Sequence, residues 1–245
     1  MVSLNVKVFA DGADKAAMLE LYNNPIVKGF TTNPTLMRQA GVSDYRAFAH
    51  DVLQVIRDRP ISFEVFSDDF DEMEEQALEI ASWGRNVYVK IPITNTLGAP
   101  SNRLISKLAA AKVQLNVTAL LTLVQVRSVI PCLADGPSSY VSLFAGRLAD
   151  TGCDPVPVMK SAVDMLKAHS NIELIWASPR ELLNIFQANS VGCHIITVTR
   201  DVLRKMELIG KDLTEYSLDT VKMFRNDAVK AGYSLKRRTA ATPGS

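Results

Sequence analysis

Lys90 is the residue whose type and setting most directly suggest chemistry. It stands inside the otherwise apolar run from Val87 to Ile93, which has the character of a β-strand. Burying an ammonium is costly, and the neutral amine that avoids this cost is a nucleophile toward carbonyl groups. The alternative is that Lys90 points to water from an edge strand. The other residues of the chain must decide between these two interpretations.

Further polar residues gather where predicted strands end. Every predicted strand except the last carries or precedes at least one of them, and they are Asp11, Thr31, Thr32, Asn33, Glu64, Lys90, Asn116, Thr118, Ser142, Arg147, Ser178 and Arg180. Several have an ordinary explanation, since Asp11 before Gly12 and Asn33 before Pro34 are also turn signals. Glu64 is harder to explain in this way, because carboxylates are rarely buried without a partner. The convergence of these side chains favours a functional site.

The chemistry that this set suggests is covalent catalysis through a Schiff base. Lys90 would attack a ketone, and the resulting iminium would accept electrons when an adjacent carbon–carbon bond breaks. Asp11 suits the base that takes the hydroxyl proton of the departing fragment, and Glu64 with Thr118 suits proton transfer during dehydration of the carbinolamine. Asn33 and Asn116 could hold the enamine in place.

The chain has residues suited to bind a phosphate, but it lacks a cluster suited to bind a metal. Arg147 and Arg180, with Ser142 and Ser178, could hold a phosphate, because the planar guanidinium matches phosphate oxygens. The histidines are His50, His169 and His194, and they show no ligand spacing. A zinc site needs such a cluster, so we predict no metal. No Ser-His-Asp or Cys-His arrangement is indicated either.

Short β-branched runs alternate with amphipathic segments of helical length along the chain. The predicted strands are Leu4–Ala10, Gly29–Thr32, Ile61–Phe66, Val87–Ile91, Gln114–Val117, Tyr140–Ala145, Ile172–Ala177 and His194–Val198. The predicted helices are Asp14–Tyr22, Tyr45–Arg57, Asp69–Trp83, Ser101–Ala111, Leu121–Leu133, Pro155–Ala168, Pro179–Ala188, Asp201–Leu208 and Leu213–Ala231. Ser178-Pro179 is interpreted as a helix start, since proline suits the first turn.

Eight such units, with strands that are apolar on both faces, predict an α/β protein with a single (β/α)8 TIM barrel and an additional C-terminal helix. No GxGxxG motif follows the first strand, which weakens the dinucleotide-binding alternative. A closed barrel has no edge, which removes the simplest explanation of Lys90. We expect the catalytic barrel over 1–211, a helix over 212–232 that packs on the barrel or on a neighbouring subunit, and a flexible tail over 233–245.

Composition excludes several classes of protein. Lys and Arg number 27 and Asp and Glu 26, so the net charge is +1, and no basic surface for nucleic acid or anionic membranes is indicated. No segment has eighteen consecutive apolar residues, and the N-terminus does not resemble a signal peptide. The three cysteines form no CxxC pair. We therefore expect reduced thiols in a cytoplasmic protein that binds neither nucleic acid nor membrane.

Five motifs together resemble a known family. They are Val87–Thr94, Thr31–Pro34, Asn116–Thr118, Ser142–Asp150 and Ala177–Arg180. In this order and on these strands they resemble the transaldolases, in the short form related to fructose-6-phosphate aldolases. The resemblance runs from Asp11 to about Val198, and it implies a (β/α)8 enzyme that acts on sugar phosphates without a cofactor.

The resemblance also implies a role for each matching residue. Lys90 matches the Schiff-base lysine, Asp11 the acid/base of carbon–carbon cleavage, and Glu64 and Thr118 the pair that works with the catalytic water. The remaining matches are substrate-binding residues: Asn33 and Asn116 for the dihydroxyacetone unit, Ser142 and Phe144 for the pocket wall, and Arg147, Ser178 and Arg180 for the phosphate. Short members of the family are often pentamers or decamers, so a homo-oligomer is expected.

Two positions bear on the choice between a transferase and a free aldolase. Fructose-6-phosphate aldolases usually have Gln where this chain has Glu64 and Tyr where it has Phe144, so both positions resemble a transaldolase. A free aldolase that releases dihydroxyacetone or a related small carbonyl compound stays open, because small changes in a pocket alter acceptor choice. A phosphosugar-binding protein without catalysis is a third interpretation, although no member of the catalytic set is missing.

Overall fold

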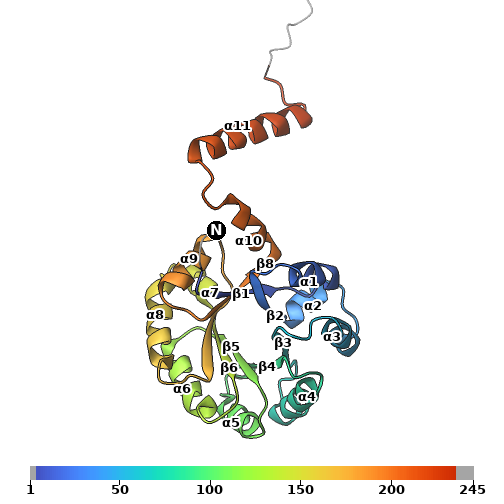
Figure 1. The fold of residues 1–245 in the computed structure, drawn as a ribbon, viewed down its shortest axis with the longest axis vertical. Helices are drawn as coiled ribbons and strands as arrows, with labels where there is room; N and C mark the ends of the chain where they lie inside the picture. The colour runs from blue at the N-terminus through green and yellow to red at the C-terminus, as the bar shows by residue number, and fades with distance from the viewer. Residues whose placement is uncertain (1–3, 236–245) are drawn as a thin grey trace, which may run out of the picture. The chain divides into compact units, whose positions relative to one another are not determined.

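The computed structural model describes residues 4–235, which divide into two compact units between Arg204 and Lys205. The first unit is a closed barrel in which every strand pairs in parallel with the next and β1 pairs with β8 (Figure 1). Its strands are β1 (Lys7–Asp11), β2 (Val27–Thr31), β3 (Ile61–Glu64), β4 (Val87–Pro92), β5 (Leu115–Leu120), β6 (Ser139–Leu143), β7 (Ile172–Trp176) and β8 (Ile195–Thr199). The predicted (β/α)8 barrel is confirmed.

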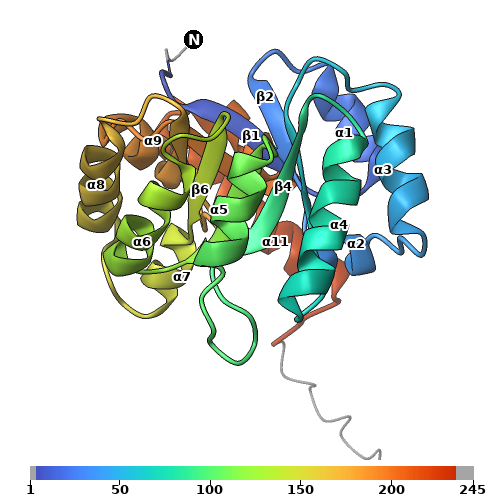
Figure 2. The same ribbon diagram turned by 90° about the horizontal axis from the view of Figure 1, so that it is seen from below.

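The helices of the first unit lie outside the strands (Figure 2). They are α1 (Lys15–Tyr22), α2 (Pro34–Gln39), α3 (Tyr45–Leu53), α4 (Phe70–Ser82), α5 (Asn102–Ala110), α6 (Leu123–Leu133), α7 (Ala145–Asp150), α8 (Pro155–Leu166), α9 (Leu183–Ser190) and α10 (Arg200–Arg204). Aspartates fix where many of them begin: Asp14, Asp44, Asp69 and Asp154 each accept a hydrogen bond from a backbone N–H of the first turn.

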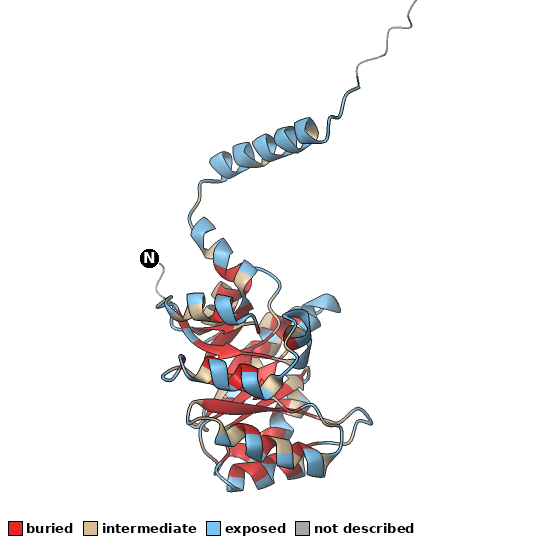
Figure 3. Cartoon of the chain, turned by 90° about the vertical axis from the view of Figure 1, so that its right-hand side faces the viewer, coloured by how far each residue is buried: buried red, intermediate tan, exposed pale blue. Residues whose placement is uncertain are grey.

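The barrel interior is filled by side chains, which explains why the strands are apolar on both faces. Phe9, Tyr88, Tyr140, Ile175, Ala177 and Ile195 form a buried cluster there. Gly29 makes room for it, because a Cβ at that position would lie 2.6 Å from the Phe9 ring. Figure 3 shows buried strands surrounded by helices with exposed outer faces. The packed interior supports the polar residues farther along the strands.

β4 lies between β3 and β5, so Lys90 is on an interior strand of a closed barrel rather than at an edge. Side chains alternate along a strand, and Lys90 follows Tyr88 of the interior cluster by two residues. Lys90 therefore points into the barrel, nearer to the carboxyl end of β4. The interpretation that it points to water from an edge strand is wrong.

Three local features differ from the sequence-based expectation. α2 and α7 were not predicted, because each has only six residues and follows a strand at a turn signal or beside a glycine. Pro179 does not begin a helix: α9 starts at Leu183, and Ser178 adopts a positive φ of 58° in the turn before it. Ser178-Pro179 is thus a bend that follows β7.

The second unit contains a 3-10 turn (Lys205–Leu208) and α11 (Leu213–Lys230). Asp212 caps α11 by accepting hydrogen bonds from the N–H groups of Thr214 and Glu215. No residue of α11 is buried. Most of the predicted tail, 236–245, lies outside the described residues. Among the described helices, none is both long enough and apolar enough to cross a membrane.

Candidate active site

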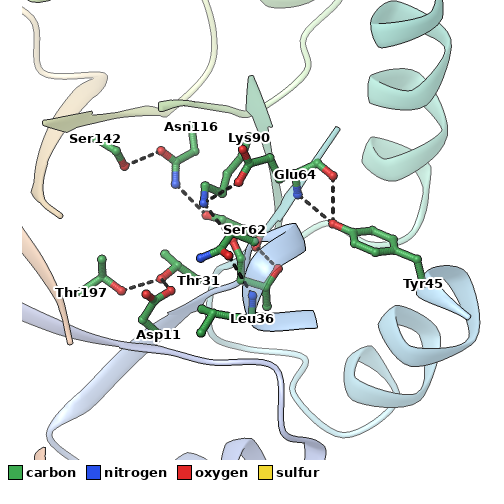
Figure 4. Close-up of polar contacts among 12 residues, drawn as sticks. Asp11, Thr31, Leu36, Tyr45, Ser62, Glu64, Lys90, Asn116, Ser142 and Thr197 are labelled. Atoms are coloured by element: carbon green, nitrogen blue, oxygen red, sulfur yellow. Dashed lines mark hydrogen bonds and ion pairs between the residues drawn. The ribbon is translucent and has the colours of Figure 1, made fainter. Parts of the chain in front are cut away.

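Lys90 is the centre of a polar site at the carboxyl ends of the strands (Figure 4). Only 6% of the residue is exposed. Its Nζ lies 2.9 Å from Oε2 of Glu64 and donates a hydrogen bond of 2.8 Å to the carbonyl of Thr32. Glu64 and Lys90 stand opposite each other in the β3–β4 register, which explains the ion pair. A buried amine is thus held beside a carboxylate that can exchange protons with it.

Tyr45 fixes the backbone from which Glu64 projects. Its hydroxyl accepts a hydrogen bond of 2.8 Å from the Glu64 N–H and donates one of 2.9 Å to the Glu64 carbonyl. A tyrosine hydroxyl is protonated at neutral pH, and burial raises the pKa of Tyr45 further. Both bonds are visible in Figure 4. No signal in the sequence singled out Tyr45, because its role depends on how α3 packs beside β3.

Asp11 ends β1 and is only partly exposed. Its Oδ1 accepts a hydrogen bond of 2.7 Å from Oγ1 of Thr31. Burial raises the pKa of Asp11 above its ordinary value; the positive charge of Lys90 and the Thr31 hydrogen bond oppose this, and the negative charge of Glu64 adds to it. These electrostatic contributions mean that Asp11, Lys90 and Glu64 act on one another within a single site.

Asn116 is buried and both ends of its amide are bonded. Nδ2 donates to Oγ of Ser62 at 3.0 Å, and Oδ1 accepts from Oγ of Ser142 at 2.7 Å. These bonds fix which way the amide faces. Ser62 was not among the predicted site residues, although it stands two residues before Glu64 on a predicted strand and has the same inward alternation.

Thr118 carries a buried hydroxyl without a partner in the described part of the chain, and Asn33 caps a helix. The Thr118 hydroxyl is buried and has no hydrogen-bond partner among the described residues, which is uncommon for a buried donor. Asn33 is the N-cap of α2, since its Oδ1 accepts from the N–H of Leu36 at 3.0 Å. Asn33-Pro34 was interpreted as a turn signal, and in the structure it begins the short helix α2. This capping role does not exclude a second role for the amide NH2 group.

The remaining predicted residues follow β6 and β7, where the start of α7 and the loop after β7 approach each other closely. A Cβ on Gly146 would lie 1.4 Å from the carbonyl oxygen of Ser178, so only glycine fits there. This contact brings the chain segments that carry Arg147 and Arg180 together. Arg147 is exposed, and its guanidinium carbon lies 5.9 Å from the centre of the Phe144 ring.

Arg180 is paired with Asp150 rather than with a predicted site residue. Its Nε donates to Oδ1 of Asp150 at 2.9 Å, and Nη2 contacts Oδ2. This pair lowers the pKa of Asp150, so the carboxylate stays charged beside Arg180. Asp150 was quoted within a motif but was given no role. It supplies a negative charge at the place where the sequence predicts phosphate binding.

The histidine that stands closest to a strand end is structural. Nδ1 of His194 accepts a hydrogen bond of 3.0 Å from the N–H of Leu174, at the opposite end of the barrel from Lys90. Among residues 4–235, no group of three or more His, Cys, Asp or Glu side chains is arranged to hold a metal ion. The prediction that this chain needs no metal stays a prediction.

Comparisons with solved structures show the fold alone. KGPDC from Streptococcus mutans matches with a TM-score of 0.53 at 10% identity, over 81% of this chain and 88% of that one. A structure called "Native KDPGal structure" matches with a TM-score of 0.54 at 10% identity, over 81% and 84%. At this level of identity, a shared barrel carries no information about function.

Sequence relatives are much closer. This chain is 34% identical to a "Probable transaldolase" of Dehalococcoides mccartyi over 82% of its length and 90% of the relative. It is 31% identical to a "Probable transaldolase" of a Thermoanaerobacter species over 94% of its length and 100% of the relative. The family model described as transaldolase/fructose-6-phosphate aldolase matches residues 8–235. The chain therefore belongs to the transaldolase/fructose-6-phosphate aldolase family, as its five motifs predicted.

Proposed function

We propose that this protein is a transaldolase that moves a dihydroxyacetone unit from a ketose phosphate to an aldose phosphate through a Schiff base on Lys90. Fructose 6-phosphate and sedoheptulose 7-phosphate are the proposed donors. The observation that carries the proposal is the buried amine of Lys90 in contact with Glu64, in a chain of this family. A buried lysine with a proton acceptor beside it is suited to attack a ketone.

Formation of the Schiff base needs proton transfer at two points. Nζ must lose a proton before it attacks, and the carbinolamine oxygen must gain one before it leaves as water. Glu64, at 2.9 Å from Nζ, can take the first proton. Its carboxylate, with a water held by the unpartnered Thr118 hydroxyl, can supply the second. Tyr45 keeps the Glu64 backbone in place during both transfers.

Carbon–carbon cleavage needs a base for the hydroxyl at C4 of the ketose. Asp11 suits this role because burial raises its pKa, so its conjugate acid can return the proton to an incoming aldehyde in the reverse step. The electrons of the broken bond move into the iminium and form an enamine on Lys90. Asn116, fixed by Ser62 and Ser142, and the NH2 group of Asn33 would hold the hydroxyls of the enamine.

The phosphate would bind between the start of α7 and the loop after β7. Arg147, Arg180 and Ser178 would supply the donors, and Gly146 allows α7 and this loop to approach. Because Arg180 is already paired with Asp150, an incoming phosphate dianion must compete with that carboxylate for the guanidinium. This competition favours a substrate with two negative charges over one with a neutral end.

A free aldolase that releases dihydroxyacetone to water is the alternative, and it uses the same residues around Lys90. The contact between Glu64 and Lys90 favours the transferase, because transaldolases carry the glutamate at this position. Phe144, which has no hydroxyl and packs on the interior cluster, favours it as well. The two activities differ only in what reacts with the enamine: the aldehyde of an aldose phosphate or a proton.

The test is release of glyceraldehyde 3-phosphate from fructose 6-phosphate, measured through a coupled dehydrogenase with and without erythrose 4-phosphate. Sustained release that requires erythrose 4-phosphate is expected. Equal release in its absence would identify a free aldolase. No release under either condition, with a substrate that binds, would support a sugar-phosphate-binding protein instead. Lys90→Ala is the control for contaminating activity and should give no release.

We further propose that the protein is a cytoplasmic homo-oligomer, a pentamer or decamer. The support is the apolar surface of α11, on which Leu213, Tyr216, Val221 and Phe224 are all exposed. A single helix has no core of its own, so these side chains call for a partner surface. In the proposed oligomer the helix packs on a neighbouring subunit; packing on its own barrel is the alternative.

A further inference from the structure

Three hydroxyl and carboxyl groups from neighbouring strands form a chain of hydrogen bonds at the candidate site. Oγ1 of Thr197 on β8 lies 2.5 Å from Oγ1 of Thr31 on β2, and Oγ1 of Thr31 lies 2.7 Å from Oδ1 of Asp11 on β1. β1 pairs with both β8 and β2, which explains how the three side chains meet (Figure 4). Thr197 and Thr31 are both buried, with 5% and 3% exposed.

The charge of Asp11 sets the direction of this chain. An ionised carboxylate only accepts hydrogen bonds, so the single hydroxyl proton of Thr31 is given to Asp11. The short contact between the threonines then has to use the proton of Thr197. The chain therefore runs from Thr197 to Thr31 to Asp11, and each bond polarises the next.

We propose that Thr197 is a positioning residue that acts on the Asp11 carboxylate through the Thr31 hydroxyl. By occupying a lone pair of Thr31, Thr197 holds that hydroxyl in the rotamer that points its proton at Asp11. It thereby favours the ionised form of Asp11, which the base of carbon–carbon cleavage requires. The importance of Asp11 for catalysis rests on the proposed function, but the hydrogen-bond chain and its effect on the carboxyl group do not.

Other charges also act on Asp11, and the chain must be distinguished from them. Lys90 on β4 and Glu64 on β3 contribute opposite electrostatic effects. Asp14 and Arg200 line the same cavity, of about 410 Å³, as Asp11. Replacing Thr197 by valine alters none of these charges and keeps the shape of the side chain. Any change in the titration of Asp11 in that variant therefore reports on the hydroxyl.

The test is the titration of Asp11 by NMR, with 13C at the side-chain carboxyl of aspartate and Asp11→Asn to assign the signal. Removing the Thr31 donor in Thr31→Val should raise the pKa by about 1 unit, as expected for a lost hydrogen bond to a charged group. Thr197→Val should raise the pKa by about 0.3 unit, since the strengthening of one hydrogen bond by its neighbour is only a fraction of the energy of that bond. Thr197→Ser, which keeps the hydroxyl, should match the wild type.

The double variant Thr31→Val/Thr197→Val gives the decisive comparison. If Thr197 acts through Thr31, the double variant titrates like Thr31→Val alone. An unchanged pKa in Thr197→Val, or a further rise when both hydroxyls are removed, would overturn the proposal. If Thr197→Val does not fold, Thr197→Ala replaces it in both comparisons.

A kinetic readout separates this inference from the proposed function. The acid limb of the pH profile of kcat/KM should move upward in Thr197→Val by the same amount as the NMR titration. A shift by NMR in a protein without aldol activity would leave the hydrogen-bond chain in place and refute the function. Activity that depends on Lys90, with no shift of the Asp11 pKa in Thr197→Val, would support the proposed function and refute the effect of the hydrogen-bond chain.

Discussion

The buried environment of Asp11 makes its ionised carboxylate costly for the stability of the fold. Desolvation raises its pKa above the ordinary value of 3.8, so ionising it at neutral pH costs folding free energy. That cost is fully present above the folded-state pKa and absent below 3.8, the unfolded-state value. The proposed reaction needs a base at this point, which would account for a carboxylate in such a costly environment.

Asp11→Asn should therefore be more stable but much less active. Since the amide carries no charge, we expect a higher melting temperature than that of the wild type at pH 7. The difference should shrink as the pH falls through the folded-state pKa of Asp11. We expect kcat to fall by about 10²- to 10⁴-fold, which is typical for loss of a general base. Calorimetry at several pH values and the coupled assay measure both effects.

Equal activity in Asp11→Asn and the wild type would contradict the proposed base. A lower melting temperature at pH 7 would contradict the electrostatic account.

Tyr45 illustrates how a helix, through one side chain, places the proposed acid/base group Glu64. α3 delivers its hydroxyl to the N–H and carbonyl of Glu64, where β3 ends. Tyr45→Phe leaves both backbone groups unpaired. We expect the free energy of unfolding to fall by about 1–3 kcal/mol and kcat to fall as Glu64 loses its fixed position beside Lys90. Chemical denaturation and the coupled assay measure the two quantities.

Tyr22→Phe is the matched control for this variant. The Tyr22 hydroxyl donates to Asp58 at 2.6 Å at the surface, and both residues precede the start of a strand, at the opposite end of the barrel from Lys90. We expect it to change stability by a few tenths of a kcal/mol and to leave kcat unchanged. A Tyr45→Phe variant with normal kcat would show that Glu64 needs no such support.

The sequence predicts the elements of the barrel well because each strand and long helix has its own periodic pattern. All eight predicted strands overlap the observed ones. Short helices such as α2 are different: Asn33-Pro34 is both a turn signal and the N-cap of that helix, and local residues do not separate the two. The start predicted at Pro179 failed for the same reason.

Contacts within the site are less predictable than its residues. The alternation along each strand indicates that Lys90 and Glu64 face inward, but their contact depends on the register of β3 against β4. Thr197 was not identified, since the predicted eighth strand has no charged residue to draw attention to its inward face. The ion pair between Asp150 and Arg180 was missed because it joins the end of α7 to the loop after β7.

At the scale of the whole molecule, the exposed apolar side chains of α11 indicate a surface that another part of the protein or another subunit covers. Phe224 is 65% exposed and lies on the same side of the helix as Val221. We expect light scattering to give a mass that is a multiple of 26.9 kDa, with five or ten copies. Phe224→Glu should lower that mass, because burying a carboxylate in an apolar contact is costly.

Asn226→Glu is the control for this prediction, since it adds the same charge at an exposed position on the opposite side of α11. It should leave the mass unchanged. A monomeric mass for the unmodified protein would contradict the oligomer. It would leave packing of α11 on its own barrel as the remaining possibility.

The central claim is that Lys90 forms a covalent bond with the substrate. The most direct test is to reduce the protein with borohydride in the presence of fructose 6-phosphate and to measure its intact mass, followed by peptide mapping. We predict a stable adduct on the peptide that contains Lys90, with a mass gain of dihydroxyacetone minus the water lost in Schiff-base formation plus two hydrogens, and no adduct in Lys90→Ala. An active enzyme that gains no adduct, or an adduct on another lysine, would contradict the account.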